Sequence, residues 1–530
     1  MKNQGWKHII LLAAVAMMST MTAETVRARQ NIVIGAVSVR YDHQDRTYDN
    51  NGSAVAVADG SAGDVVAQGV GNATADNGPR VFVLEDRTGD RRDYSLTPRI
   101  TFSSAGINDV VRLTYAPGVR YDHIAETTDL NHDCGLHLEK RFTRNWLVTL
   151  NNHFFLGEDP LRNEELRTAD IQGAGEGSAP PVPAVGSPPP EPDQTLTERF
   201  GRRRYWTNTM DANSEYTYGE DRLLRLGYTF DVLRNDDGDI GGYTDYDRHT
   251  GDLLLHHRLD RKWSGEGEIG YTRGLFDEPN ILIGDQAQRE AVVIDSDDVK
   301  EYKARLRGIY DISSYSHLFT EYSYLGTDYD SSLRVDSDIH NLALGVNYDI
   351  SQHLHVTMSG GPSWLVRDNS PTETDYNAYG SVTRDFLHGT ATMFAEKSYA
   401  QDNFDGRGSG LTDSWDIGVN LDYQLTRDLT ATLFATYTHD QRKQLPLSQT
   451  VILVDQDQSV STEPDQFEYT EKDYEAGFSL AYTFLRWYTF TSGYRYYNHD
   501  SELMTTNGTD SYHEHRAYIE LAVSKDLFRW

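Results

Sequence analysis

The chain has 530 residues, and its 81 acidic against 49 basic residues give a net charge of −32, which argues against nucleic acid as a partner. Its 38% of hydrophobic residues and mean hydropathy of −0.61 are low for one soluble core of this length, but they suit short strands in which every second residue faces lipid. The single cysteine, Cys134, excludes an intramolecular disulfide framework and a haem attachment motif.

The N-terminus predicts a secretory signal. Two lysines and a histidine precede an apolar stretch from Ile9 to Met18, and small residues follow at Ala23 and Ala28. The stretch is too short to span a bilayer as a helix. We expect cleavage after residue 28, with Ala23 as the alternative, and the mature chain then carries about −34 because the signal removes +2. No later stretch predicts an inner-membrane helix.

A strand-like segment, Val33–Tyr41, follows almost at once. A TonB-dependent transporter would place a plug domain before its first strand, so we do not expect that class. The next segment, Ala54–Gly78, is rich in Ala, Gly, Val and Asp, and it either folds inward as a constriction or stays disordered. The Pro-rich segment Gly173–Asp193 favours extended backbone, as a surface loop or as a docking arm for a partner.

Apolar and polar residues alternate with a period of two through the rest of the chain. In Leu224–Val232, Tyr302–Ile312 and Leu342–Ile350, mostly large apolar residues oppose Arg, Lys, Gly, Thr, Asn and Asp. In Tyr474–Phe484, Tyr, Ala, Phe, Leu, Tyr and Phe oppose Glu, Gly, Ser, Ala and Thr. Only a β-strand places such sets on opposite faces, and lipid outside with water inside explains the contrast. The sequence therefore predicts an all-β fold, a transmembrane antiparallel up-and-down β-barrel.

Connections alternate between short turns and longer polar segments. Nine short turns, with both chain ends on the periplasmic side, predict about 20 strands, or 18 if one weak pair belongs to a loop; the weakest strands are near 201–217 and 390–402. The turns are near Gly106–Asn108, Thr143–Asn145, Gly219–Asp221, Asp260–Lys262, Ser313–Ser316, Ser351–His353, Leu387–Gly389, Thr426–Asp428 and Leu485–Arg486. The outward segments are near 43–93, 122–130, 157–202, 234–243, 275–297, 327–335, 368–375, 402–412, 440–471 and 499–512.

Charges on the polar stripes are expected to face the lumen, because Arg or Lys facing lipid near the midplane costs roughly 2–4 kcal/mol. The pore-lining candidates are Arg99, Arg112, Arg120, Glu139, Arg141, Arg225, Asp231, Lys303, Arg305, Arg307 and Glu475. They either create a transverse field and a size filter or only neutralise one another across the wall. The candidates for aromatic contact with the membrane are Tyr474, Tyr482, Phe484, Tyr488, Phe490, Tyr494, Tyr496 and Trp530.

Acidic clusters gather in the predicted outward loops, as solvated surface or as cation sites. Asn235, Asp237 and Asp239 have the spacing of part of an oxygen-rich Ca²⁺ loop but lack the distal bidentate Glu. No other cofactor is expected, and the acidic loops predict a net preference for cations. No spacing singles out a catalytic triad, so we assign no catalytic residue and do not expect an enzyme.

The C-terminus ends in Phe528 and Trp530, which resembles the terminal aromatic signature read by barrel-assembly machinery. Ile519, Leu521 and Val523 define the apolar face, and the two terminal aromatics have the opposite parity. A β-bulge near Lys525–Asp526 is therefore predicted to bring both sets outward.

Three N-terminal stretches carry a resemblance: Val39–Asp42, Leu113–Tyr121, and Leu130–His132 with Thr143–Trp146 at a following turn. They resemble a broad family of poorly characterised bacterial outer-membrane β-barrel proteins associated with exopolysaccharide gene clusters. The resemblance implies a barrel of this general size with a part in polysaccharide export, and it supplies no site residues.

We therefore expect one barrel domain over residues 29–530, exported to the outer membrane as a multi-pass protein. Its expected function is that of a porin-like conduit for polysaccharide or small hydrophilic solutes through a polar lumen. The alternative is a non-transporting barrel, either a sheath for a multihaem cytochrome or a surface adhesion protein. Expected partners are outer-membrane lipid and lipopolysaccharide, the barrel-assembly machinery and a polysaccharide or periplasmic export partner.

Overall fold

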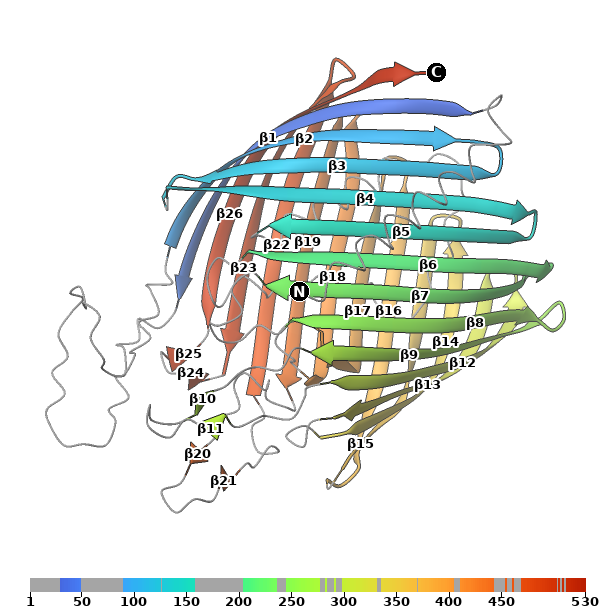
Figure 1. Cartoon of the computed structure of the whole chain (residues 1–530). Coiled ribbons are helices and arrows are strands. Elements are labelled where there is room, and N and C mark those ends of the chain that lie inside the picture. Colours follow the sequence, from blue (N-terminus) through green and yellow to red (C-terminus); the bar gives the residue numbers. More distant parts are fainter. Residues whose placement is uncertain are drawn as a thin grey trace, which may run out of the picture.

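Twenty long antiparallel strands close into a barrel in the computed structural model (Figure 1). The structure describes residues 29–48, 89–124, 126–157, 204–235, 245–276, 298–330, 335–368, 370–404, 410–442, 469–502 and 511–530, and the short strand pairs named below. The barrel strands are β1 (Gln30–Tyr48), β2 (Gly89–Ala105), β3 (Asp109–Asp122), β4 (Thr127–Thr143), β5 (Trp146–Gly157), β6 (Tyr205–Gly219), β7 (Arg222–Asn235), β8 (Tyr246–Arg258), β9 (Trp263–Phe276), β12 (Val299–Ser313), β13 (Ser316–Tyr329), β14 (Ser337–Ser351), β15 (Leu354–Arg367), β16 (Glu373–Phe386), β17 (Gly389–Asp402), β18 (Gly410–Thr426), β19 (Leu429–Arg442), β22 (Tyr469–Phe484), β23 (Tyr488–Ser501) and β26 (Tyr512–Arg529).

The predicted fold class, strand number and short turns are confirmed. All nine short turns join strands at one end of the barrel, which we call the short-turn end, where β1 also begins and β26 ends. The two weakest predicted strands are β6 and β17. The opposite, long-loop end carries three small strand pairs: β10 (Leu282–Ile283) with β11 (Glu290–Ala291), β20 (Leu453–Val454) with β21 (Val460–Ser461), and β24 (Met504–Thr505) with β25 (Gly508–Thr509).

Several strands run farther toward the long-loop end than the sequence predicted. β1 continues to Tyr48 and β2 begins at Gly89, although a connection over 43–93 was expected. Residues such as Gln44 and Arg46 are polar, so the apolar alternation fades while the backbone ladder continues. Backbone pairing needs no apolar side chains, and this is why the prediction stopped the strands too early.

The outer face carries the apolar side chains and the inner face carries the polar ones. Leu306 and Leu344 are 64% and 67% exposed on the outside, whereas Arg307 and Asn347, on the same strands, point inward. Directly opposed tyrosines add aromatic contacts to the outer face, as in Tyr437 and Tyr474, whose ring centroids are 4.7 Å apart. A continuous exposed apolar surface of this kind suits contact with lipid.

The first and last strands close the barrel with continuous pairing from Ile32–Arg529 to Tyr48–Tyr512. The register shifts once, because Val33 pairs with Phe528 while Ile34 pairs with Asp526, which leaves Leu527 as the extra residue. The predicted bulge is confirmed one residue beyond Asp526. Phe528 and Trp530 are 65% and 63% exposed on the outside, as the parity argument required.

Some predictions fall outside the described residues. They concern the signal over 1–28, the segment 54–78, the Pro-rich segment 173–193 and the Ca²⁺ candidate, of which Asp237 and Asp239 lie beyond the end of β7. Within the described part of the chain, no helix is long and apolar enough to cross a bilayer.

Candidate functional site

The predicted pore-lining residues all lie at inward-facing strand positions. On β12, for example, Tyr302 and Leu306 are exposed on the outside, so Lys303, Arg305 and Arg307 face inward. Whether the candidates form a conducting path stays a prediction, because their positions alone do not measure flow.

Most of these charges contact an opposite charge on the next strand. Arg305 Nη2 lies 2.8 Å from Glu266 and 2.7 Å from Glu268. The other cross-strand pairs are Arg307–Glu321 at 2.7 Å, Arg225–Asp252 at 3.8 Å, Asp231–Arg248 at 2.7 Å and Glu475–Arg495 at 2.8 Å, whereas Lys303 lies 3.9 Å from Glu301 on its own strand. The sequence pattern identified one member of each pair and missed the other, because cross-strand register was not available to it.

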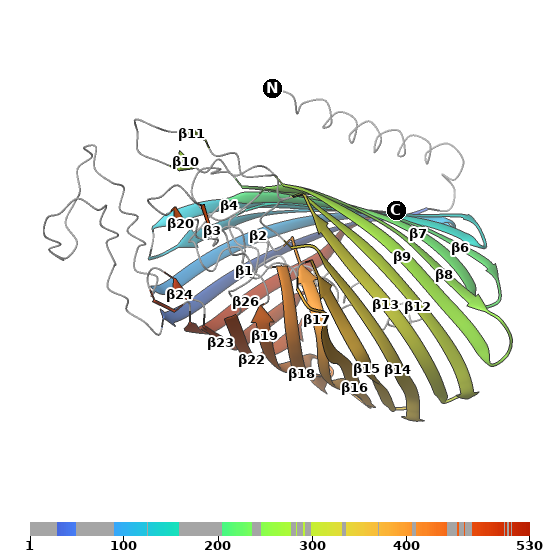
Figure 2. The same ribbon diagram turned by 90° about the horizontal axis from the view of Figure 1, so that it is seen from below.

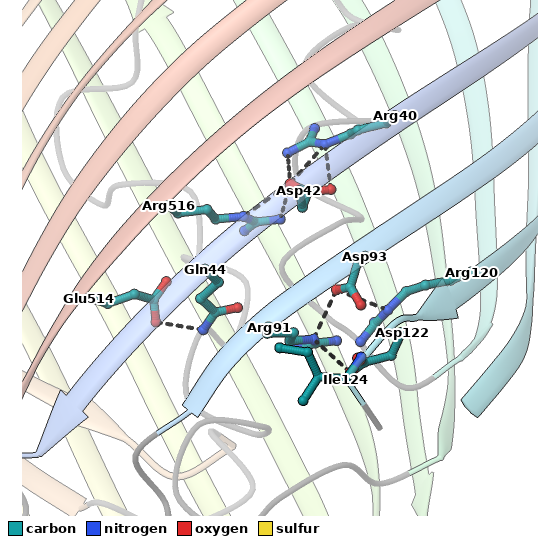
Figure 3. A network of polar contacts seen from close by, with 10 residues as sticks. All are labelled: Arg40, Asp42, Gln44, Arg91, Asp93, Arg120, Asp122, Ile124, Glu514 and Arg516. Carbon is teal, nitrogen blue, oxygen red and sulfur yellow. Dashed lines mark hydrogen bonds and ion pairs between the residues drawn. The ribbon is translucent and has the colours of Figure 1, made fainter. Parts of the chain in front are cut away.

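The densest polar network covers the inner face of β26, β1, β2 and β3 (Figure 3). Asp42 accepts from Arg40 at 2.8 Å and from Arg516 at 3.2 Å, so two guanidinium groups share one carboxylate. One strand further, Asp93 lies 2.9 Å from Arg91 and 3.3 Å from Arg120, whose side chain is almost fully buried. Arg516 and Arg120 thereby join neighbouring strands through side chains on the inner face.

The sector from β17 to β23 has a threonine-rich inner face that also carries aromatic rings and several carboxylates, among them Asp416, Asp422 and Asp473. Phe394 lies directly opposite Gly418 and Phe434 directly opposite Gly477, and each ring occupies the space where a glycine side chain would stand. The rings therefore lie against the wall with one face toward the lumen, and both are half-buried. Tyr518 lies on Gly493 in the same way, but Arg40 covers its ring at 4.0 Å.

Hydroxyl groups surround the two uncapped rings. Thr432 donates to Asp422 at 2.8 Å and Thr438 donates to Asp416 at 2.7 Å, which fixes both threonines on the inner face. Neutral hydroxyls beside an aromatic face provide donors, acceptors and an apolar contact within one surface. A surface with donors, acceptors and aromatic faces side by side is able to bind a polyhydroxylated solute.

One hairpin leaves the wall and enters the lumen. β16 and β17 pair only from Phe386–Gly389 to Ala378–Lys397, whereas β17 and β18 stay paired up to Asp402–Gly410. The end of this hairpin turns inward at the long-loop end (Figure 2). We call residues 398–404 and 410–411 the tongue.

The tongue is anchored at its base by a buried lysine. Lys397 Nζ contacts Asp375 of β16 and lies 3.1 Å from Asp413 of β18, and its side chain is only 7% exposed. The ammonium group also lies 4.7 Å from the ring centroid of Tyr376. Two carboxylates and an aromatic face therefore hold one cation at the point where β17 separates from β16.

The middle of the tongue packs on the inner wall. Leu411 forms a buried cluster with Ile339 and Leu365, and Tyr399 packs against it. Gln401 donates to the hydroxyl of Tyr329 at 2.7 Å. Tyr399 and Leu411 stand at strand positions whose side chains would face lipid in a regular barrel wall. Here they pack on the inner face of β14 and β15, so the end of the hairpin lies inside the wall.

The tip of the tongue reaches strands that are distant along the wall. Asn403 donates to Glu301 of β12 at 2.9 Å, and both side chains are buried. Phe404 joins a buried cluster with Tyr246 and Val299, and Arg248 covers its ring at 4.9 Å. Burial of a side chain such as Phe404 or Leu411 contributes roughly 1.5–3 kcal/mol. The tongue is thus a packed constriction on one side of the lumen.

The sequence prediction missed the tongue and treated 402–412 as an outward loop, which is wrong for the described residues of that segment. A local signal was present. The outward positions of β17 run from Ala391, Met393 and Ala395 to Lys397 and then Gln401, so the apolar stripe becomes polar. This change accompanies the separation from β16, although similar changes at other strand ends accompany ordinary loops.

The membrane-aromatic candidates lie at outward-facing positions near both ends of the barrel. Tyr482, Phe484 and Tyr488 stack in a row near the short-turn end, with centroid distances of 5.9 and 5.3 Å. Tyr494 and Tyr496 lie toward the long-loop end beside His515. The others, Tyr474, Phe490 and Trp530, are 45%, 40% and 63% exposed. In the part of the chain that the structure describes, no group of three or more His, Cys, Asp or Glu side chains is placed to hold a metal ion.

No protein-family model matches the chain, and no curated protein matches it either. Among solved structures, the siderophore receptor PirA from Pseudomonas aeruginosa aligns with 10% identity and a TM-score of 0.46, over 93% of this chain and 80% of that chain. The FrpB iron transporter from Neisseria meningitidis aligns with 7% identity and a TM-score of 0.46, over 95% and 83%. Likeness at this level does not identify a transported solute. The fold is established by the strand order of the barrel itself.

Proposed function

We propose that the protein is an outer-membrane channel that conducts neutral hydrophilic solutes, with saccharide chains as the main class. The observation that carries the proposal is the inner face of the β17–β23 sector, where Phe394 and Phe434 lie flat among hydroxyl side chains. The apolar faces of sugar rings pack on aromatic faces, and sugar hydroxyls exchange hydrogen bonds with threonine and carboxylate oxygens. Passage occurs by diffusion along this wall, without covalent chemistry.

The outer-membrane location is part of the proposal. It is supported by the exposed apolar outer face, the tyrosine rows and the short turns gathered at one end. The suggested polysaccharide cargo agrees with the resemblance carried by the N-terminal third. The ion pairs on the opposite wall leave few net charges there, so a neutral solute meets little electrostatic barrier.

The test is planar-bilayer conductance of the refolded protein, with linear neutral oligosaccharides of increasing length as blockers. We expect stable conductance steps and a block that strengthens with chain length. Phe394→Ala and Phe434→Ala should weaken the block, because each removes one stacking surface. Phe478→Ala is the matched control, since Phe478 is 49% exposed on the outer face and should not affect the block. Equal block in all three variants would contradict the saccharide path.

The same recordings test ion selectivity. The acidic loops predict a reversal potential that favours cations in a salt gradient. A reversal potential that favours anions would show that inner-wall arginines such as Arg99 and Arg112 outweigh the loops.

A further inference from the structure

The two strands that separate at the tongue have matching unpaired edges. Residues 374–377 of β16 pair with β15 on one side, and the ladder with β17 stops at Ala378–Lys397. Residues 398–402 of β17 pair with β18 on one side, and their side toward β16 lies beyond the end of the β16–β17 ladder. If the register simply continued, residue 377 would pair with 398 and residue 373 with 402. An unpaired edge inside a sheet is a ready template for a strand.

The side chains of the tongue also fit that second position. In the continued register, Tyr399 would lie directly opposite Tyr376, and both would face outward. The outer face already contains directly opposed tyrosines at Tyr41–Tyr94, Tyr271–Tyr302 and Tyr437–Tyr474, with ring centroids 5.1, 5.4 and 4.7 Å apart. A Tyr376–Tyr399 pair would be a further example of this arrangement. The sequence of β17 is therefore compatible with a place in the wall as well as with its place in the lumen.

The contacts in the lumen are of a kind that a segment can release. Lys397, Gln401 and Asn403 hold the tongue through polar groups that water can replace. The apolar contacts of its described residues are made by Leu411, Tyr399 and Phe404, which pack on the inner wall. Release of the tongue would exchange these contacts for a backbone ladder between β16 and β17 and for the tyrosine pair, so both positions have compensating interactions.

We propose that the tongue is a gate with two positions: folded against the inner wall, as in this structure, and zipped into the wall beside β16. The inner position narrows the lumen at the long-loop end, and the wall position clears it. This inference rests on the proposed channel function, because a gate controls flow. Lys397 at the hinge keeps the gate folded inward by bridging Asp375 and Asp413.

The experiment uses cysteine cross-links in the full-length protein, in a Cys134→Ser background. The pairs Thr374→Cys with Gln401→Cys, and Asp375→Cys with Ala400→Cys, are directly opposite only in the wall position. Successive pairs in an antiparallel ladder alternate between hydrogen-bonded and non-hydrogen-bonded. One of these two pairs is therefore non-hydrogen-bonded, and its closer Cα atoms are within the distance that a disulfide spans. Glu301→Cys with Asn403→Cys, joined by a short bifunctional thiosulfonate reagent, holds the inner position. Thr320→Cys with Leu344→Cys, directly opposite in the uninterrupted wall, is the positive control.

We expect at least one wall-position pair to form a disulfide in membranes, and its oxidation to raise single-channel conductance at least twofold, reversibly on reduction. The Glu301–Asn403 link should give the lower conductance. Failure of both wall pairs while the control pair forms would overturn the gate, and so would a wall disulfide that leaves conductance unchanged. Silence of every correctly folded variant would instead overturn the channel function, and the cross-linking yields would still report separately whether the tongue moves.

Discussion

Two seams of the barrel differ in a way that the chain order does not predict. The seam between β1 and β26 joins the two ends of the chain, yet it is paired over its whole length and crossed by the Asp42 network. The seam between β16 and β17 joins two strands connected by a short turn, yet pairing stops at Ala378–Lys397. Closure is therefore complete at the seam where no turn connects the two strands. The interruption of the β16–β17 ladder follows from the local sequence of β17 and from the contacts that its side chains make in the lumen.

The largest expected effect is at the closed seam. Asp42→Ala removes the carboxylate shared by Arg40 and Arg516, both of which are buried. We expect the free energy of unfolding to fall by about 3–5 kcal/mol, because loss of one partner leaves buried charge uncompensated. Denaturant unfolding in lipid vesicles, followed by tryptophan fluorescence, measures the change.

The control for this prediction is Asp526→Ala on β26, the other strand of this seam. Its partner Arg529 is exposed, so the loss should stay below about 1 kcal/mol. If the two variants destabilised the barrel equally, the Asp42 network would contribute no more than a surface ion pair, and the contrast between the seams would need another cause.

The second effect sharpens the contrast at the open seam. Lys397→Met leaves Asp375 and Asp413 without the cation between them, which should lower the free energy of unfolding by about 1–3 kcal/mol. Because the gate loses its hinge contact, conductance should also rise. Lys525→Met is the control, since Lys525 lies over Trp487 near the short-turn end and should leave conductance unchanged. A variant that is destabilised without any change in conductance would make Lys397 a structural residue only.

The same contrast shows what the sequence could predict. Lipid outside and water inside impose a two-residue period of apolar and polar side chains. The strand Tyr474–Phe484 and the turn at Leu485–Arg486 could therefore be predicted from the sequence alone. The C-terminal bulge could be predicted too, because Phe528 and Ile519 would point to opposite faces of a regular strand. The inner-face positions of the charged candidates followed from parity alone.

The tongue was not predictable from local pattern. Its tip depends on Phe404 meeting Tyr246 and Phe276, which are far away in the sequence and several strands away around the wall. Its base depends on Lys397 lying between carboxylates of two strands. Pairing partners across a curved sheet are set by register and curvature, and alternation within one strand carries no information about either.

A third variant tests the flat aromatic sector, which belongs to the intact part of the wall. Gly418→Val places a side chain where the Phe394 ring lies, so the ring must swing into the lumen. We expect a cost of about 1–3 kcal/mol from overpacking, together with weaker oligosaccharide block. Gly380→Val is the control, because no atom lies within 4 Å of the added Cβ there. Equal behaviour of the two variants in the block assay would show that the flat ring does not contact the solute.

The smallest effect concerns a turn at the short-turn end, away from both seams. The Asp260 carboxylate accepts from the backbone amides of Lys262 at 2.7 Å and Trp263 at 2.8 Å, and these bonds lower the pKa of this exposed carboxyl. Because the folded-state pKa is depressed, the carboxylate stabilises the turn above the ordinary aspartate pKa of about 4, and this contribution disappears as the pH falls through the lowered value. Asp260→Asn should therefore lower the unfolding midpoint slightly at neutral pH, with a difference from the unmodified protein that shrinks on acidification. Asp428→Asn removes the same charge from the turn between β18 and β19. If both variants showed the same pH dependence, the effect would come from net charge and not from the two backbone hydrogen bonds.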